Sequence, residues 1–423
     1  MQKMKIEEKL VKTLIRQGGP SVFSWSEIYL NPYQGCYHNC VYCDGKSEHY
    51  HMHDDFGDRI FVKKNAPALF EKFLKSKSFQ PVHEKEQSVI DEFFPSLKAI
   101  PNSKVLPKSI ITIGGGVCDS YQQAEETVKI TRKLLEIVYN YQFPLWILTK
   151  NDLVLRDIDL IKKINKETYA CVNFTITLSD EKAQKIFEPR ASTTSERFEA
   201  IRILRKEEIH SGVYCYPSLP FIGNTDKNIQ EIYQRAKRVG AEFIYCDGLT
   251  LKPSRSKNEF MQTLRQYYPD LYPKYELLYS NNNKYGHLDQ EQFEDLGLMQ
   301  SLHRGYKFGY EMELDYAAKR FVPEGRLTVN LQLSELLRRI VYLKGSILYE
   351  ARYEVNAFNN AAKLVENSSR DFGKLRGDEF ADIPTNIQVK DVIKEFVLTG
   401  KSAYLKDLEK RTYDYLVDKY YTE

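Results

Sequence analysis

The stretch that decides the fold is NPYQGCYHNCVYC, residues 31–43, which holds three of the seven cysteines of the chain. Cys36, Cys40 and Cys43 are spaced C-x3-C-x2-C and directly follow the first predicted strand, 27–30. Three thiolates this close together can grip one face of a metal cluster. A cubane iron–sulfur cluster has four irons, so three cysteines would leave one iron open to a substrate or cosubstrate.

A structural zinc site is the alternative for this loop, because zinc in such sites takes four ligands. One of four histidines would supply the fourth: His38, His49, His51 or His53. The position of the loop after the first strand of a strand–helix series favours the iron–sulfur cluster. The histidines at 49–53 alternate along the chain, so an extended segment would present all three on one side, beside Asp54 and Asp55. Metal binding and a solvated loop are both open for this segment.

Strand-like and helical stretches alternate between residues 26 and 250. The β-rich runs are 27–30, 110–113, 145–149, 170–177, 212–216 and 242–246, and the helical stretches are 122–141, 152–165, 195–209 and 226–239. Nearly continuous apolar strands that alternate with helices predict right-handed βαβ crossovers and a mostly parallel sheet. We therefore expect an α/β fold, a partial (β/α)6 barrel over 26–250 with its chemistry at the carboxyl ends of the strands.

The two ends of the chain lie outside this alternation. We expect 1–25 to be an N-terminal helical segment and 251–423 to be a mostly helical C-terminal region. The clearest amphipathic helices of that region are 331–350 and 389–421. The segment 44–109 is expected to be a long excursion between the first and second strands.

Composition narrows the class of protein. The 423 residues include 42% hydrophobic residues, enough for a sizeable core, and no run approaches the roughly 18 apolar residues of a membrane span. The N-terminus lacks the apolar core of a signal peptide. We expect a cytoplasmic protein with reduced thiols and no membrane partner. The net charge of +3, from 61 basic and 58 acidic residues, argues against a wholly basic nucleic-acid-binding chain.

The cysteine loop, with an aromatic residue before its last cysteine, resembles that of the radical S-adenosylmethionine (SAM) superfamily. The wider pattern resembles the spore photoproduct lyase-like branch and covers roughly residues 25–275. Besides the cysteine loop, the segments that carry the resemblance are IFVKKNAPALF, GGGVCDSYQQAE, WILTKNDLVLRD, VNFTITLSDEKAQKIFEPRASTTSERFEAIRIL and YCYPSLPFIGNT.

The resemblance implies two cofactors, a [4Fe–4S] cluster and SAM. Cys36, Cys40 and Cys43 would hold the cluster, and Tyr42 would lie against the adenosyl part of SAM. An electron from a partner such as flavodoxin or ferredoxin would cleave SAM to a 5′-deoxyadenosyl radical, which abstracts hydrogen from the substrate.

The same resemblance implies contacts to SAM at the ends of three predicted strands. The expected contacts are Gly114, Gly115 and Gly116 to the amino group, Lys150 to the carboxylate, and Thr175 and Thr177 to the carboxylate or ribose. Each has a plain alternative: a strand-to-helix turn, a solvated lysine, or the usual β-branched residues of a strand. Arg190 would either anchor an anion or pair with Glu188.

Cys118 stands where spore photoproduct lyases have the cysteine that donates hydrogen to the repaired thymine, and a small buried hydrophobe is the alternative. Asp44 departs from the lyase pattern, which has a tyrosine directly after the third cluster cysteine. The regeneration of SAM is therefore in question. Cys171, Cys215 and Cys246 lie inside predicted strands and are expected to be core residues.

Three functions follow from these features. The first is a radical SAM enzyme that acts on a damaged nucleic acid such as a pyrimidine dimer. Two local basic clusters could then contact phosphates: Arg202, Arg205 and Lys206, or Lys252, Arg255 and Lys257. The second is the same radical chemistry on RNA, a peptide or a small molecule. The third is a non-catalytic metal-binding interaction protein.

Overall fold

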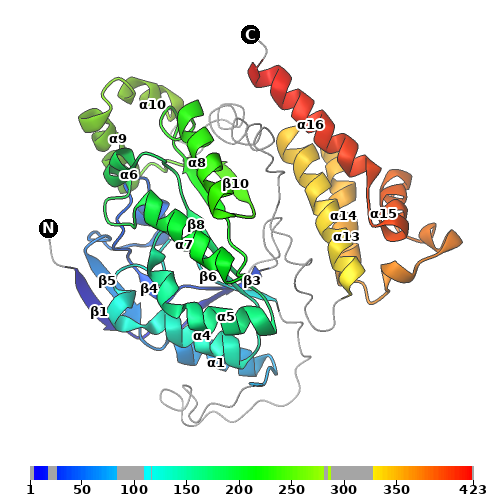
Figure 1. Ribbon diagram of the computed structural model, residues 1–423, viewed down its shortest axis with the longest axis horizontal. Coiled ribbons are helices and arrows are strands. Elements are labelled where there is room, and N and C mark those ends of the chain that lie inside the picture. Colours follow the sequence, from blue (N-terminus) through cyan, green and yellow to red (C-terminus); the bar gives the residue numbers. More distant parts are fainter. Residues whose placement is uncertain are drawn as a thin grey trace. The chain divides into compact units, whose positions relative to one another are not determined.

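The computed structural model describes residues 4–17, 26–82, 109–115, 117–280, 284–286 and 327–421. The chain divides into two compact units. The larger, here the N-terminal unit, comprises 1–19 and 26–313, and the smaller, the C-terminal unit, comprises 20–25 and 314–423. Figure 1 colours the first from blue to green and the second from yellow to red.

A seven-stranded sheet is the centre of the N-terminal unit, with the order β10-β9-β8-β7-β6-β3-β2. Its strands are β2 (Ile15–Gln17), β3 (Ser26–Leu30), β6 (Ile110–Gly114), β7 (Leu145–Thr149), β8 (Ala170–Thr175), β9 (Val213–Ser218) and β10 (Ile244–Gly248). Six of them are parallel, and only β2 at the edge pairs antiparallel, with β3. The predicted mixed α/β fold with an incompletely closed barrel is confirmed.

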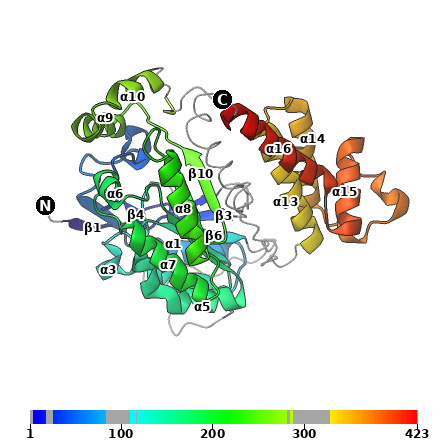
Figure 2. The same cartoon turned by 45° about the horizontal axis from the view of Figure 1, so that its top comes forward.

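Helices cover one face of this sheet (Figures 1 and 2). They are α4 (Ile130–Asn140), α5 (Ile158–Glu167), α7 (Thr194–Lys206) and α8 (Asp226–Val239), with the shorter α3 (Glu125–Val128) and α6 (Glu181–Phe187) beside them in sequence. Local signals set their ends. Thr193 and Glu196 form a capping box at the start of α7, and α8 ends at Gly240, whose φ is +75°.

The other face of the sheet, here the inner face, is lined by aromatic rings. Cys246 Sγ lies 3.9 Å from the Tyr233 hydroxyl of α8, so it points to the helices. Its neighbour Tyr245 therefore points the other way, since side chains alternate along a strand. The ring of Tyr214 lies 5.3 Å from that of Tyr245 and 5.6 Å from that of Trp146. These three rings lie on the inner face.

The N-terminal residues differ from the prediction. The described residues there contain two strands, β1 (Lys5–Lys9) and β2, and no helix. Strand β1 pairs in parallel with β5 (Arg59–Lys63) in a second sheet of order β1-β5-β4, where β4 is Tyr33–Gln34. Charged and apolar residues alternate in this segment, a pattern that suits a half-exposed strand. The neighbouring β5 favours the strand, because it supplies the hydrogen-bond partners that an isolated segment lacks. The helix α1 (Ala66–Ser76) follows this sheet.

The region after β10 is helical where it is described. Helices α9 (Arg255–Tyr267) and α10 (Tyr272–Leu278) belong to the N-terminal unit, so the division of the chain falls later than the predicted residue 250. The C-terminal unit contains α13 (Thr328–Tyr342), a short π-helix (Leu343–Ile347), α14 (Arg352–Asn367), α15 (Ile387–Thr399) and α16 (Ala403–Tyr421). None of the helices in the described part of the chain is long and apolar enough to cross a membrane.

Candidate functional site

The three clustered cysteines lie on one tight loop after β4. The Asn39 backbone N–H donates to the Cys36 carbonyl at 3.2 Å, and the Cys43 N–H donates to the Cys40 carbonyl at 3.1 Å. All three thiols are free; Cys36 and Cys40 are buried and Cys43 is partly buried. The 3-10 helix Asp44–Lys46 follows directly. The loop thus holds three thiols within two consecutive turns.

Burial dominates the acid–base behaviour of these thiols. It raises the pKa of Cys40 to about 12, and it also raises the pKa values of Cys36 and Cys43. Buried thiols of this kind ionise when a metal binds and replaces the proton. Among the described residues, no three Cys, His, Asp or Glu side chains are grouped to hold a single metal ion. A [4Fe–4S] cluster has a different requirement, because each thiolate binds a separate iron.

Two side chains of the segment after β6 fasten the cysteine loop to the sheet. Asp119 accepts hydrogen bonds from the hydroxyl of Thr149 at 2.9 Å and from the backbone N–H of Lys150 at 2.8 Å, and it lies 3.1 Å from Nε2 of His38. Gln122 accepts from the Tyr37 N–H at 2.8 Å. Burial opposes the ionisation of Asp119, but the bonds from His38 and the two backbone groups outweigh it and lower its pKa. The loop position is therefore fixed by β6 and β7.

A buried charge network lies beside Cys40. The hydroxyl of Tyr42 and the guanidinium of Arg197 both donate to the carboxylate of Glu188, and all three side chains are buried. The ammonium of Lys150 lies 5.7 Å from the centre of the Tyr42 ring. Burial opposes the charge on Glu188, but Arg197 and Lys150 keep its pKa below the ordinary value. The hydrogen bond to Glu188 sets the orientation of the Tyr42 ring.

The structure places the Lys150 ammonium near the Tyr42 ring, and the other residues expected to contact SAM lie as follows. Gly114 and Gly115 have φ of +83° and +70°, so they form the turn after β6, and Gly116 lies outside the described residues. Thr175 is buried, and its carbonyl accepts a hydrogen bond from Arg197. These observations leave the roles of the glycines and Thr175 toward SAM as predictions.

Three polar atoms near the carboxyl ends or inner face of the strands have no hydrogen-bond partner among the described residues. They are Thr177 Oγ1, Ser218 Oγ and Trp146 Nε1, all buried. Buried polar atoms normally have hydrogen-bond partners, so a polar molecule bound against the inner face of the sheet would supply the partners of these three atoms. Sequence reasoning missed Trp146 and Ser218. The tryptophan before ILTK was a visible signal, whereas the position of Ser218 depends on the register shift between β9 and β10, which leaves no mark in the sequence.

Cys118 lies beside the cysteine loop and is 4% exposed. Burial raises the pKa of its thiol to about 12, and Lys63 and the hydrogen bonds to the Gly35 backbone and the Asn31 side chain only partly oppose this rise. The thiol thus keeps its hydrogen at neutral pH. That state suits a hydrogen-atom donor and also a buried core residue.

Asp44 connects the cysteine loop to the segment that follows β10. It forms an ion pair with Lys252 and accepts a hydrogen bond from Thr250 at 3.0 Å. Two residues on, Lys46 forms an ion pair with Glu259 of α9 at 2.7 Å. Since β3 and β10 stand far apart in the sheet order, these contacts join distant parts of the sheet at their carboxyl ends. We call them the latch.

The histidine segment is not extended, contrary to the prediction. Residues Glu48–Tyr50 form a 3-10 helix and His51 has φ of +53°, so the three histidines do not share one side. His53 Nδ1 lies 2.8 Å from Asp55. The turn arises because Ser47 caps the short helix by accepting from the His49 N–H.

The remaining sequence candidates have structural partners. Cys171, Cys215 and Cys246 are buried within β8, β9 and β10, as expected of core residues. Arg190 pairs with Asp58 at 2.8 Å instead of Glu188. Four members of the two basic clusters form ion pairs inside the unit: Arg202 with Glu199, Arg205 with Glu242, Lys252 with Asp44 and Arg255 with Asp54.

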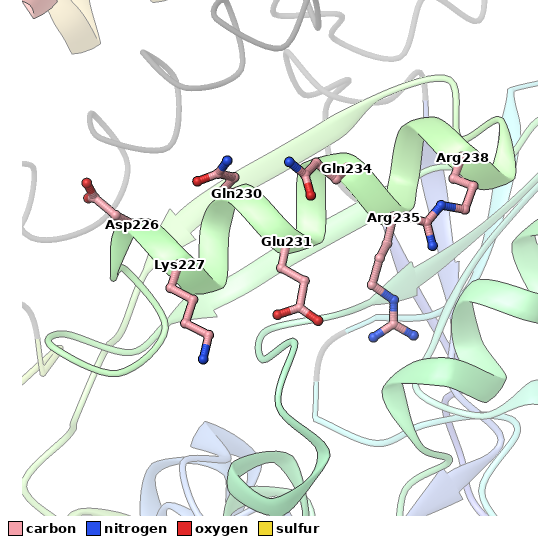
Figure 3. A pocket seen from close by; sticks show the side chains of 7 residues that line it. All are labelled: Asp226, Lys227, Gln230, Glu231, Gln234, Arg235 and Arg238. Atoms are coloured by element: carbon pink, nitrogen blue, oxygen red, sulfur yellow. The ribbon is translucent and has the colours of Figure 1, made fainter.

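A surface depression on α8 is separate from these groups. Figure 3 shows its lining side chains along that helix: Asp226, Lys227, Gln230, Glu231, Gln234, Arg235 and Arg238. Both signs of charge occur, and Arg235 donates to Ser195 at 2.9 Å. This pattern is that of the solvated side of an amphipathic helix.

Comparisons with known proteins found a family model, sequence relatives and solved structures. Residues 30–236 match the model described as the radical SAM superfamily. An uncharacterized protein of Methanocaldococcus jannaschii is 27% identical over 255 residues, 60% of this chain and 81% of that protein. An uncharacterized protein of Mycobacterium tuberculosis is 23% identical over 59% of this chain and 66% of its own length. A solved spore photoproduct lyase with bound AdoMet and dinucleoside spore photoproduct matches with a TM-score of 0.41 and 16% identity, over 62% of this chain and 66% of that one.

Proposed function

Residues 30–236 belong to the radical SAM superfamily, whose members use a [4Fe–4S] cluster and SAM, and on that premise we propose that Cys36, Cys40 and Cys43 hold the cluster. The observation that carries the proposal is the set of three free thiols on one tight loop, with Tyr42 and Lys150 beside them. The bound cluster supplies the electron that cleaves SAM and yields the radical for hydrogen abstraction. A one-electron reductant of the flavodoxin or ferredoxin kind is the partner that this chemistry requires.

The residues around the loop would bind and orient SAM. The Lys150 ammonium can pair with a carboxylate, and the Tyr42 ring offers an aromatic face to a purine. Thr177 Oγ1 and Trp146 Nε1 are buried and lack partners among the described residues, so they can bond to polar groups of the same molecule. Gly114 and Gly115 leave room for a close approach of the backbone to its amino group.

Anaerobic reconstitution tests the cluster. We expect a brown protein with about four irons and four sulfides per chain, which forms 5′-deoxyadenosine from SAM and a reductant. Cys40→Ala should abolish both. Cys246→Ala is the matched control, because it removes a buried thiol from the helix side of β10 and should leave both intact. A colourless protein with one zinc would contradict the proposal.

For the substrate, we propose a damaged nucleic acid that carries a pyrimidine photoproduct, with Cys118 as the hydrogen donor. The lyase-like sequence pattern and the protonated, buried Cys118 thiol support this substrate, while the internal pairing of the basic clusters weakens it. RNA, a peptide or a small molecule is the alternative. The test is restoration of thymine in UV-irradiated oligonucleotides. Failure in preparations that cleave SAM would exclude repair, and unchanged rate and products in Cys118→Ala would exclude the donor role.

A further inference from the structure

Two lysines lie side by side on one face of the small sheet β1-β5-β4, at the carboxyl ends of β1 and β5. Lys9 and Lys63 are direct partners in the parallel register of β1 and β5, so their side chains project from the same face as close neighbours. Figure 1 shows this sheet near the N-terminus. Like charges in such cross-strand positions repel, and the pair destabilises the sheet unless another charge compensates it.

At the opposite end of the same face, the cationic side chains form ion pairs with carboxylates. There Lys5 pairs with Glu7 at 2.8 Å, and Arg59 pairs with Asp55 at 2.9 Å. Both cations on that end therefore have a carboxylate. The contrast with Lys9 and Lys63 lies within one pair of strands.

Lys9 and Lys63 contact only neutral groups, and one of these is the Phe61 ring, whose centre lies 4.9 Å from the Lys9 ammonium. The Lys63 ammonium donates to the backbone carbonyl of Asn31 at 2.7 Å, and that of Lys9 donates to the amide oxygen of Gln34. Neither lysine forms an ion pair with any residue that the structure describes. Burial lowers the pKa of both, and more of Lys63 than of Lys9 is removed from water. Partly buried charges of one sign call for a counter-charge.

Asn31 connects this pair to Cys118. Its carbonyl accepts a hydrogen bond from the Lys63 ammonium at 2.7 Å, and its side chain bonds to the Cys118 thiol. The lysines that act on Cys43 are instead Lys46 and Lys150. The cluster loop therefore has its own cations.

We propose that Lys9 and Lys63 bind an oxyanion of the substrate, a phosphate or a carboxylate, next to Cys118. A lysine is a compact point charge that suits such oxygens, and two of them match a group with several acceptors. That the ligand is the substrate rests on the proposed function; that the two lysines form an oxyanion site does not. The site limits the substrate to molecules that carry an oxyanion within reach of Cys118, which a nucleic acid satisfies and an uncharged small molecule does not.

Binding of inorganic phosphate to the full-length chain tests the site, with sodium acetate as a second probe and sodium chloride at matched ionic strength as the blank. The melting temperature should rise with phosphate concentration and reach a plateau. Lys9→Met and Lys63→Met should each weaken this binding about tenfold and, by relieving repulsion, should not lower the melting temperature without phosphate. Lys5→Met, on the paired end of the same face, is the control and should bind phosphate normally.

The readouts separate this proposal from the function on which it builds. The proposed site would be wrong if the Lys9→Met/Lys63→Met double variant showed the same rise in melting temperature with phosphate as the wild type. It would also be wrong if Lys5→Met weakened phosphate binding as much as the double variant does. A response to acetate but not to phosphate would assign the site to carboxylate substrates, and the reverse would assign it to phosphate esters. Neither measurement needs SAM cleavage, so an inactive cluster leaves the result readable.

Discussion

At the scale of single residues, the chain contains the same arrangement twice. Tyr42 donates to Glu188, which pairs with Arg197, and Tyr33 donates to Glu125, which pairs with Arg156. Only the first lies beside Cys40 and Lys150. The two arrangements therefore allow a tyrosine hydroxyl that donates to a buried, arginine-paired carboxylate to be removed at two places, and only one of them lies beside Cys40 and Lys150.

Tyr42→Phe should weaken SAM binding about tenfold, at the lower end of what outer partners of a metal site contribute, because the ring loses its anchor while the cysteines stay. Equilibrium binding of SAM to the reconstituted protein, with iron content measured alongside, checks this. Tyr33→Phe should lower the free energy of unfolding about as much as Tyr42→Phe does, and it should leave the affinity for SAM unchanged. Equal losses of affinity in the two variants would show that the effect is only structural.

Arg197→Met should destabilise the N-terminal unit by about 3–5 kcal/mol, because it leaves the buried carboxylate of Glu188 without its main partner. Urea unfolding measures the change. Arg202→Met is the comparison: its pair with Glu199 is exposed and should contribute at most about 1 kcal/mol. The double change Arg197→Met/Glu188→Gln should recover part of the loss. Similar values for Arg197→Met and Arg202→Met would contradict the role assigned to the network.

At the residue scale, the sequence located the cysteine loop but not the side chains that surround it. The spacing of the cysteines is local, so the loop was visible directly. Glu188 and Asp119 were not identified, because Glu188 contacts Tyr42 across 146 positions and Asp119 contacts His38 across 81. A carboxylate that becomes a hydrogen-bond centre only after folding leaves no periodic pattern in the sequence.

At the scale of elements, the latch joins the loop after the cysteines to α9. Glu259→Gln should lower stability by about 1–3 kcal/mol, because the Lys46 side chain is 4% exposed and loses its charged partner. Since Lys46 follows Cys43 by three residues, a chelator should also bleach the cluster faster. Thermal melting and bleaching rates measure both effects. Glu276→Gln in α10, whose contact with Arg265 is an exposed 4.0 Å pair, should change neither.

Sequence patterns predicted the central strands well, because each is a short apolar run bounded by helical stretches. They predicted β1 wrongly, since its five residues depend on pairing with β5, more than 50 positions away. The predicted helix at 389–421 is two helices, because Gly400 takes φ of +69° and ends α15. The sequence shows Gly400, but it does not show that the helix ends there, because a glycine within an amphipathic pattern can also be tolerated inside a helix.

At the scale of the whole molecule, the chain has two compact units, each with its own buried core. In the C-terminal unit, Lys344 is the charged centre of that core. Its side chain is 2% exposed, forms ion pairs with Glu350 and Glu354, and bonds to the Tyr404 hydroxyl at 3.0 Å. Burial opposes the charge, but these partners outweigh it and raise the pKa of Lys344 above 10.5. Its stabilisation is therefore complete at neutral pH and is lost only as the pH rises through that raised value.

Lys344→Met should accordingly lower the free energy of unfolding of the C-terminal unit by about 2–4 kcal/mol at pH 7, since two carboxylates lose their shared cation. The difference between wild type and variant should be complete below the ordinary lysine pKa and should be lost as the pH rises through the raised pKa of folded Lys344, where the wild-type lysine loses its proton. Far-ultraviolet circular dichroism follows the helices during unfolding, and iron content reports on the cysteine loop. Because each unit has its own core, we expect the helical transition to shift while iron content stays the same. A parallel loss of iron would mean that the two units unfold as one, against the division of the chain.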